Sequence, residues 1–360
     1  MRDRHAMPLL GSWCCKLRFS LRTALVVTTV LCAVLAWLGY RVSALHTKVN
    51  ALARLRSLGA SIQLDDIKGA RLPDNWLFGF LGDDACRDVK WVSLDYNANA
   101  DLCLRELPAL GSIHIVTLHA ANVSSRGLAH LQNVKFADGN VCLAGTSVCD
   151  GDLARLHDID RLHTLDLSWT QVSDAGLFSL STLSDLEELD LSGVNVEGWG
   201  LAHLSRLTRL KCLRLEETSI EGKWLVALSH IEELSLAGAL IDDDDVRSLC
   251  QLKRLRTLNL DRTSVSDRGL RYLCESSTLT SISLERTQVT SEGTRFLRNI
   301  RELAEVSLRG CRIDDSAMPY LVAVVNLKTL LLYETNVSDG AISDFQRVRP
   351  ETTLFWRIGK

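Results

Sequence analysis

The residues with the clearest capacity for chemistry are four consecutive aspartates, Asp242 to Asp245, in the stretch LIDDDDVRSL. Carboxylates this close together could hold a divalent cation, because calcium and magnesium prefer oxygen ligands. The run could also form an acidic docking patch, or it could cap a helix, since carboxylates accept hydrogen bonds from the free N-H groups of a helix start. The surrounding sequence must decide between these readings.

Other side chains with catalytic or ligating potential do not form a recognisable site. Cys142 and Cys149 lie near each other in the sequence, but no His or Cys pair accompanies them at a ligand spacing. The 11 cysteines include no CxxC pair, which disfavours both a zinc ribbon and a disulfide framework. No Walker A, GxSxG, HExxH or EF-hand motif occurs. We therefore expect no enzyme activity, no cofactor and no metal.

Length and composition set the class of protein. The chain has 360 residues, of which 46% are apolar and 24% charged, so it can bury a sizeable core. The formal net charge is -3, and the predicted pI is near 6.3. Nucleic-acid binding draws on clustered Lys and Arg, so this balance argues against a nucleic-acid partner.

An apolar run near the amino terminus predicts a membrane-spanning helix. Residues 23–40, TALVVTTVLCAVLAWLGY, carry no charge and stand between Arg22 and Arg41, with Trp37 and Tyr40 where an interfacial aromatic belt would lie. A helix of this length spans about 27 Å, enough for a hydrocarbon core. The alternatives are a buried core helix and a signal peptide cleaved after the VSA at 42–44.

The flanking charges favour one orientation only slightly. The basic residues before the span are Arg2, Arg4, Lys16, Arg18 and Arg22, and those after it are Arg41, Lys48, Arg54 and Arg56. By the positive-inside rule we expect residues 1–22 to be a basic cytoplasmic segment. The remainder of the chain would then face the extracytoplasmic side as a single-pass membrane protein.

The rest of the chain is a repeat. LHTLDLSWTQVSDAGLFSL (162–180), LRTLNLDRTSVSDRGLRYL (255–273) and LTSISLERTQVTSEGTRFL (279–297) align without a gap. We define the marker of each repeat as the last apolar residue of its LxxLxL core, and the markers are Leu94, Leu118, Leu143, Leu167, Leu191, Leu215, Leu236, Leu260, Leu284, Leu308, Leu332 and Trp356. Nine of the eleven intervals are 24 residues, and the others are 25 and 21. A fixed period of this length predicts a solenoid.

The LxxLxL motif resembles that of the leucine-rich repeat family, and it recurs about 11 or 12 times. The last leucines alternate with polar residues, as expected of a short strand with one buried face. The resemblance implies an α/β fold in which a curved parallel sheet lines the concave side and short helices cover the convex side. The entry stretches ALARLRSLGASIQLDD (51–66) and LPDNWLFGFLGDDACRDVKWVSLD (72–95) are similar to those of membrane-anchored planctomycete proteins of this family.

These observations predict four segments. A basic segment covers 1–22, a transmembrane helix covers 23–40, a linker and cap cover 41–88, and the repeat domain covers 89–360. Val42, Leu45, Val49 and Leu52 have the spacing of an amphipathic helix leading from the membrane. The aromatic and apolar side chains expected to cover the open edge of the first repeat are Trp76, Leu77, Phe78, Phe80 and Leu81.

Within each repeat, the residues after the strand predict a turn and a short helix. Three residues after the marker lies a small side chain, often Thr, whose hydroxyl can satisfy the backbone of the turn. The SDAGL-type stretch that follows predicts a helix start with a capping Ser or Asp. Its glycine should allow the helix to approach the sheet. In this register Asp242 and Asp243 take the SD positions, so helix capping explains half of the aspartate run. The run directly follows the 21-residue interval, in which Ile231 takes the place of two apolar residues three apart, so we expect the shortening to lie on the convex side.

The concave face of such a sheet normally carries the binding function. Its predicted exposed residues form a mildly acidic stripe with two arginines and an aromatic end, and the candidate binding residues are Asp166, Glu188, Asp190, Arg214, Glu216, Asp261, Glu285, Arg309, Tyr333 and Phe355. The stripe could dock a basic partner, or it could be a solvated face that limits aggregation. The aromatic end could bind a ligand or seal the last strands.

The combined interpretation is a membrane-anchored repeat protein that recognises a protein or another macromolecule. One alternative is a substrate-recognition or regulatory subunit for a separately encoded enzyme. Another is a structural envelope protein without a dedicated ligand.

Replacing a strand leucine should destabilise the repeat domain. We expect Leu191→Ala to lower the free energy of unfolding by about 2 to 5 kcal/mol, because the loss of the Leu191 Cγ and both Cδ atoms leaves a buried cavity. A change of the exposed neighbour Asp190 should leave stability unaltered. Urea denaturation followed by circular dichroism measures both variants, and equal midpoints for Leu191→Ala and the unmodified protein would contradict a buried strand position.

Overall fold

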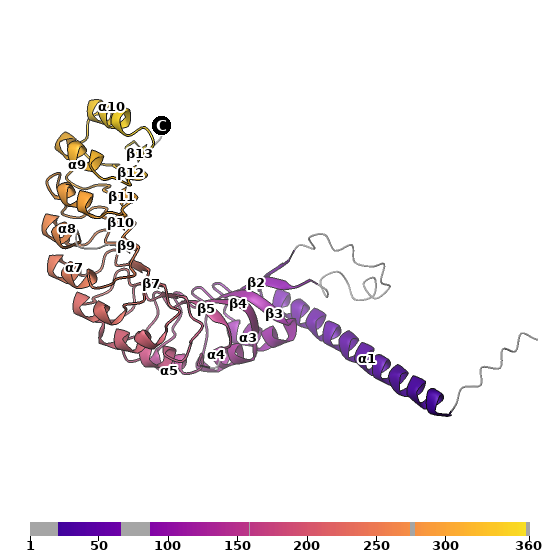
Figure 1. Ribbon diagram of the computed structural model, residues 1–360. Helices are drawn as coiled ribbons and strands as arrows, with labels where there is room; N and C mark the ends of the chain where they lie inside the picture. The colour runs from indigo at the N-terminus through magenta and orange to yellow at the C-terminus, as the bar shows by residue number, and fades with distance from the viewer. Residues whose placement is uncertain (1–20, 66–86, 158, 274–277, 358–360) are drawn as a thin grey trace, which may run out of the picture.

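The computed structural model describes residues 21–65, 87–157, 159–273 and 278–357. This part of the chain is one long helix followed by a curved array of repeats, with the strands inside the curve and the helices outside (Figure 1). The predicted basic segment before residue 21 lies outside the described residues. So do the predicted edge-covering side chains between Trp76 and Leu81.

One sheet runs through the whole array. In the described residues its order follows the chain from β1 to β13, and all neighbours are parallel except β1 and β2. The strands are β1 (Ser61–Leu64), β2 (Val89–Ser93), β3 (Ser112–Thr117), β4 (Lys135–Cys142), β5 (Leu162–Asp166), β6 (Glu188–Asp190), β7 (Cys212–Arg214), β8 (Glu233–Ser235), β9 (Thr257–Asn259), β10 (Ser281–Ser283), β11 (Glu305–Ser307), β12 (Thr329–Leu331) and β13 (Thr353–Phe355). The predicted curved parallel sheet is confirmed.

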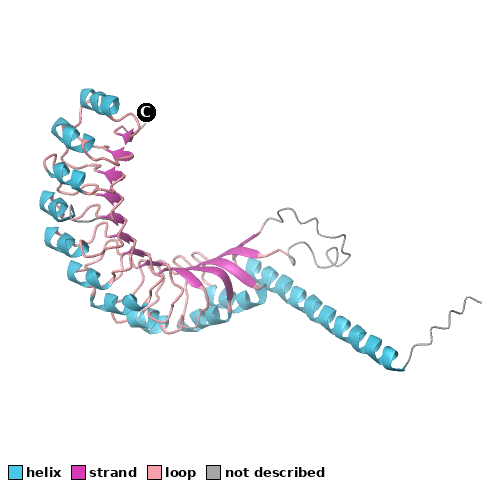
Figure 2. Ribbon diagram, viewed as in Figure 1, coloured by secondary structure: helices cyan, strands magenta, loops and turns pink. Residues whose placement is uncertain are grey.

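Short helices cover the other side of the sheet (Figure 2). The α-helices are α1 (Leu21–Ser57), α3 (Ala100–Glu106), α4 (Ser125–Leu128), α5 (Asp150–Leu153), α6 (Leu177–Leu180), α7 (Asp243–Leu249), α8 (Asp267–Leu273), α9 (Met318–Val322) and α10 (Asp339–Val348). The 3-10 helices are η2 (Leu107–Leu110), η3 (Ala129–Asn133), η4 (Trp199–Arg206), η5 (Gly222–Ala227), η6 (Gly293–Asn299) and η7 (Asp315–Ala317). None of the repeat helices could form alone, because helices this short are unstable without tertiary packing.

The repeats are stacked in exact register by their leucines. Leu189 of β6 pairs with Leu165 on one side and with Leu213 on the other. The markers that follow the strands, such as Leu167 and Leu191, are fully buried in the same continuous core. Each repeat therefore buries its apolar face against its neighbours, as expected of a solenoid.

A turn with left-handed backbone follows each marker from Leu94 to Leu332. The residue two places after the marker has a positive φ, and these residues are Tyr96, Ala120, Gly145, Trp169, Gly193, Glu217, Gly238, Arg262, Arg286, Gly310 and Glu334. We call this set the left-handed column. Each of its members from Tyr96 to Gly310 donates its N-H to the next repeat, as when Trp169 bonds to the carbonyl of Ser192 at 2.8 Å. The column thus extends the hydrogen-bonded sheet beyond the strands.

The small polar side chain in the turn acts as predicted, but within its own repeat. The hydroxyl of Thr170 donates to the carbonyl of Leu167 at 2.6 Å, and the threonines at equivalent positions in other repeats do the same. Each of these hydroxyls therefore stabilises the turn of its own repeat and does not link it to the neighbouring repeat. Repeats that have Val194 or Ala239 at this place fold into the same stack.

A second polar link joins the repeats on the convex side. The carboxylate of Asp243 accepts hydrogen bonds from the N-H and hydroxyl of Ser266 in the next repeat, at 2.8 and 2.6 Å, and from the N-H of Gly269 at 2.9 Å. Asp150 with Ser173 and Asp267 with Thr290 repeat the arrangement. A Cβ at Gly269 would collide with the Asp243 carboxylate. The same Cβ would collide with Cγ1 of the buried Val265, so this glycine allows α8 to approach both the neighbouring repeat and its own core.

The aspartate run is fully explained by this framework. Asp242 caps α7 by accepting from the N-H groups of Asp244 and Asp245, and the Asp245 side chain bonds back to the N-H of Asp242. Asp245 also accepts from the N-H of Gly222 in the preceding repeat, whereas the exposed Asp244 pairs with Arg268 at 2.5 Å. All four carboxylates thus have local structural partners.

The two irregular intervals are absorbed in different places. The 25-residue interval produces a register shift between β3 and β4, where Ile113 pairs with Phe136 and Ile115 with Asn140. The 21-residue interval shortens the convex side after η5, where the fully buried Ile231 stands three residues after Leu228 and three before Leu234. The predicted convex shortening is confirmed.

Both ends of the core are covered. Ala51, Leu52 and Leu55 of α1 are buried against the first repeat. At the far end Ile342 and Phe345 of α10 are buried, and the guanidinium of Arg349 donates to four backbone carbonyls of the preceding repeat, those of Val322, Val324, Val325 and Leu327. Carbonyls at a helix C-terminus lack partners within the helix, so Arg349 supplies donors where the fold needs them.

Two neighbouring aspartates should differ in their effect on stability. Asp243→Ala removes three hydrogen bonds between repeats, so we expect the free energy of unfolding to fall by about 1 to 3 kcal/mol. Asp244→Ala, the matched control, removes only an exposed ion pair, whose loss costs about 0 to 1 kcal/mol. Urea denaturation of both variants gives the comparison, and a larger loss in Asp244→Ala would contradict the convex link.

Candidate functional site

The concave surface is formed by the strand residues that alternate with the buried leucines, by the residue directly after each marker, and by the left-handed column. Its side chains are not needed to fill the core, so their types are free to serve recognition. The structure places all ten predicted binding residues on this surface, but it separates them into three groups along the array.

The first group surrounds a depression of about 200 Å³ on β4 to β7. It brings together the predicted residues Asp166, Glu188, Asp190 and Arg214, and the remaining lining residues are Ile115, Asn140, Val141, Cys142, Thr164 and Leu165. Three carboxylates face one guanidinium, which gives a formal charge of -2. The closest approach of that guanidinium to a carboxylate is 4.0 Å, from Arg214 to Glu188. The depression therefore combines an apolar wall with excess negative charge.

Asp166 and Asp190 use part of their carboxylates to hold the strand ends. Asp166 accepts from the N-H of Ser168, and Asp190 accepts from the N-H of Ser192, each at 2.9 Å. Burial raises the pKa of Asp190, and the charge of Asp166 adds to this effect. Because Asp190 bonds to the backbone, its replacement should lower stability, contrary to the expectation from the sequence.

The second group surrounds a larger depression of about 310 Å³ on the later repeats. The predicted residues Glu216, Asp261, Glu285 and Arg309 lie here, and the other lining residues are Ala237, Asn259, Arg262 and Arg286. Three carboxylates are balanced by three guanidinium groups. Arg262 and Arg286 were not predicted, because the prediction took strand positions and the position directly after each marker, whereas both arginines lie two residues after a marker in the left-handed column.

A network of ion pairs fixes the rim of this second depression. Glu334 accepts from Arg309 at 2.6 Å and from Arg286 at 2.9 Å, and these two arginines lower the pKa of Glu334. On the floor, the carboxylate of Asp261 accepts from the Ser283 hydroxyl at 2.6 Å and from the N-H of Glu285 at 2.7 Å. Burial raises the pKa of Asp261, with a further contribution from Glu285. The charges that line the second depression are thus largely paired within the protein.

The third group is the predicted aromatic end. The rings of Tyr333 and Phe355 lie 6.3 Å apart with a tilt of 34°. Phe355 remains 42% exposed, and Leu331 between them is partly buried. The pair is therefore an accessible apolar patch as well as part of the last strands.

Two exposed aromatic residues of the left-handed column were not predicted. Tyr96 is 74% exposed and packs edge-on against His119, while Trp169 is 61% exposed. The Trp169 ring lies over Gly193, where a Cβ would collide with it. Trp169 belongs to the same repeat as Asp166, and Gly193 to that of Asp190, so the indole lies along the rim beside the first depression. The signal in the sequence was the position two residues after the marker.

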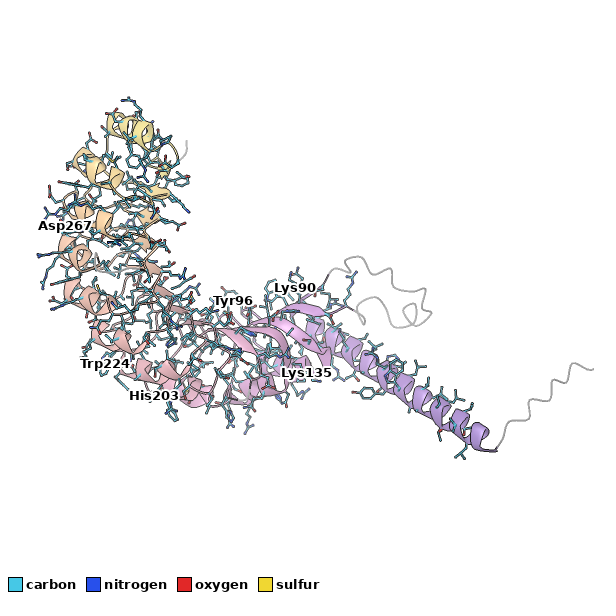
Figure 3. All side chains as sticks on the ribbon, in the orientation of Figure 1. Lys90, Tyr96, Lys135, His203, Trp224 and Asp267 are labelled. Carbon is cyan, nitrogen blue, oxygen red and sulfur yellow. The ribbon has the colours of Figure 1, made fainter. Side chains whose placement is uncertain are left out.

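The aromatic residues of the convex side, among them Trp224, differ in how far they are covered by neighbouring side chains (Figure 3). Trp224 of η5 packs over Gly198, and its ring is 5.3 Å from the Lys223 ammonium. Trp199 is 47% exposed, and Phe178 packs edge-on against His203. Trp224 therefore packs against the neighbouring repeat, whereas Trp199 is only half covered.

The site offers little to a metal or a nucleophilic reaction. Among the residues that the structure describes, no group of three or more His, Cys, Asp and Glu side chains could hold a metal ion. Cys142 lies in the first depression with its Sγ 3.2 Å from Asp166, and burial raises the pKa of its thiol to about 12. Thiols of this kind are poor nucleophiles because the thiolate is the reactive form.

Comparisons with known proteins agree with this geometry. Residues 162–181 match a family model described as leucine-rich repeat. An internalin (inlF) from Listeria monocytogenes superimposes with a TM-score of 0.52 at 17% identity, covering 75% of this chain and 87% of the internalin. The leucine-rich repeat protein LIC12759 of Leptospira interrogans gives 0.50 at 15% identity, covering 69% of this chain and 74% of that protein.

A third solved structure is also similar. TLR13, in a complex with the RNA ssRNA13, superimposes with a TM-score of 0.51 at 16% identity, covering 71% of this chain and 37% of TLR13. At these identities the likeness concerns the fold. No curated protein matches the chain.

The stacked LxxLxL strands, the convex helices and these matches define a leucine-rich repeat solenoid. The family model covers one repeat of this array, residues 162–181. Proteins of this family are generally recognition modules and not enzymes. The similarity of the entry segment to planctomycete proteins stays a prediction.

The thiols of the concave side should be unreactive in the folded protein. At pH 8 we expect N-ethylmaleimide to leave Cys142 and Cys212 unmodified, because pKa values of about 12 and about 11 leave on the order of one thiolate in 10³ to 10⁴. The exposed Cys149 should be labelled under the same conditions. Peptide mass spectrometry before and after denaturation gives the readout, and equal native labelling of Cys142 and Cys149 would contradict the assignment.

Proposed function

We propose that this protein is held in a membrane by α1 and binds a protein partner through the concave face of its repeats. The observation that carries the proposal is the first depression, whose three carboxylates face one distant guanidinium beside an exposed tryptophan. A solvent-exposed surface that binds no ligand does not need excess charge, an apolar wall and an exposed aromatic ring close together.

The chemistry of the first depression favours a basic segment of the partner. Among the described residues, Asp166 and Asp190 form hydrogen bonds but no ion pair, so a lysine or arginine could supply the missing charge. Ile115 lines the same depression and could pack against the aliphatic part of such a side chain. The exposed ring of Trp169 offers a cation-π contact at the rim. This supports the predicted basic partner over a merely solvated acidic stripe.

The remaining groups extend the proposed surface. The balanced charges of Glu216, Asp261, Glu285 and Arg309 would fix the orientation of the partner more than its affinity, because they already pair within the protein. Tyr333 and Phe355 would add an apolar contact near the end of the array.

Membrane anchoring is supported by the exposed apolar helix. The stretch Leu25–Ser57 contains a window of mean hydropathy 1.9 of which none is buried within the protein. Leu31, Val34 and Leu35 are all more than half exposed. Such a surface requires an apolar environment, which a bilayer provides. We propose an extracytoplasmic placement of the repeats on the basis of the flanking charges.

A charge reversal on the concave face should abolish partner binding. Glu188→Lys is the sharpest change, because Glu188 is exposed and, among the described residues, makes only the 4.0 Å ion pair with Arg214. We expect at least a tenfold loss of the captured partner, since like charges across an interface cost several kcal/mol. Glu302→Lys, an equal change in the exposed turn before β11, is the control.

The measurement is affinity capture of the full chain from solubilised membranes with quantitative mass spectrometry. Retention of one protein by the unmodified chain and by Glu302→Lys, but not by Glu188→Lys, is the expected result. Equal retention by all three proteins would exclude concave recognition at this depression. The identity of the retained protein also decides whether it is an enzyme that the repeats regulate.

A further inference from the structure

The junction between the membrane helix and the repeats is built as part of the repeat core. α1 continues from Leu21 to Ser57 without a break. Beyond the apolar segment one face turns inward: Val42, Leu45 and Val49 are partly buried, and Leu52 is fully buried. Leu52 and Leu55 belong to the same hydrophobic cluster as the repeat leucines. The last turns of α1 therefore stand in the place of a preceding repeat.

Hydrogen bonds and an ion pair hold the last turns of α1 to three other parts of the chain. The Nζ of Lys48 donates to the carbonyl of Arg87 at 2.5 Å, next to β2. Arg54 pairs with Glu106 of α3 at 3.3 Å. The amide of Asn97 donates to the carbonyl of Leu58 at 3.0 Å. These contacts fix the rotation of the helix about its axis as well as its position.

The end of α1 leads directly into the sheet. The N-H of Ala60 donates to the carbonyl of Leu55, and that of Gly59 to the carbonyl of Arg56, which is the Schellman pattern with Gly59 at a positive φ of 90°. Strand β1 begins at Ser61 and pairs with β2. Only Leu58, Gly59 and Ala60 separate the helix from the strand, so no flexible linker exists at this point.

The height of the repeats above the proposed membrane follows from helix geometry. Trp37 and Tyr40 are exposed at the end of the apolar segment, and the Arg41 guanidinium lies 5.5 Å from the Trp37 ring centre. These residue types mark a membrane interface. From Tyr40 to Ala51, the first fully buried residue, the helix rises about 16 Å. The first repeat thus stands close to the lipid surface.

We infer that α1 is a rigid strut that presents the concave face in one orientation and at one height, and that the partner is a protein fixed in the same membrane. A fixed pose raises the effective concentration of the binding surface only for a partner whose own orientation is also restricted. A freely diffusing partner gains nothing from a fixed pose. Repeats on a flexible tether would bind such a partner equally well. The inference rests on the membrane anchoring and concave recognition proposed above.

The rigidity is measured on the full chain in lipid nanodiscs. Spin labels on non-natural amino acids at positions 36 and 219, both exposed in the protein, report the distance between the membrane helix and the middle of the array. We expect one narrow distance distribution. A twelve-residue Gly-Ser insertion between Ala44 and Leu45, which leaves the docked turns intact, should broaden it. A broad distribution in the unmodified protein would overturn the strut.

The nature of the partner is tested by changing the helical phase at the same point. Two inserted alanines rotate the array by about 200° relative to the membrane, whereas four rotate it by only about 40° while adding more length. We expect crosslinking in intact membranes to the protein captured above to fall at least tenfold with two alanines and less than threefold with four. Equal crosslinking by both variants would show a partner that is free to reorient, and would refute the inference.

The outcomes also separate this inference from the proposed function. Carbonate extraction of the unmodified protein shows first whether α1 remains in the bilayer, and loss to the soluble fraction would reject the anchoring itself. If the protein is retained and Glu188→Lys still abolishes capture, but the two insertions behave alike, then concave recognition stands and only the membrane-fixed partner is rejected.

Discussion

The burial of leucines between adjacent repeats is the interaction on which the whole molecule depends. A single repeat has one apolar face and no way to cover it, so each strand and helix exists only because a neighbour lies against it. Leu189 illustrates this, since it pairs with a leucine on either side. The same constraint makes the ends the weak points. Residues of α1 close one end, and α10 with the Arg349 guanidinium closes the other.

Polar links supplement the leucines at both edges of the sheet. On the concave edge the left-handed column passes a backbone hydrogen bond from repeat to repeat, and on the convex side carboxylates such as Asp243 reach into the next repeat. Both links use backbone groups or side chains outside the strands. Several polar residues of the concave face also bond to the backbone, among them Asp166, Asp190 and Asp261. Function and stability therefore overlap at these carboxylates.

The character of the concave face emerges only when strand positions and the left-handed column are combined. Strand positions alone suggest an even acidic stripe. With Arg262, Arg286 and Glu334 added, the later repeats become a balanced network, while the excess negative charge is concentrated on β5 and β6. Trp169 joins that region through the same column. The proposed recognition thus concerns a smaller part of the sheet than the pattern of acidic residues indicates.

The sequence by itself determined the repeat, its strands, the convex helix starts and the apolar helix, because these follow from a period of 24 residues and from local preferences for burial and capping. It also placed the aspartate run at a helix start and the shortened interval on the convex side. Only the tertiary structure decided which carboxylates bond to which repeat, since Asp243 and Ser266 are 23 residues apart and meet through stacking. It likewise decided that α1 is fused to the core, because buried contacts of Leu52 and Leu55 cannot be told from an amphipathic linker by spacing alone.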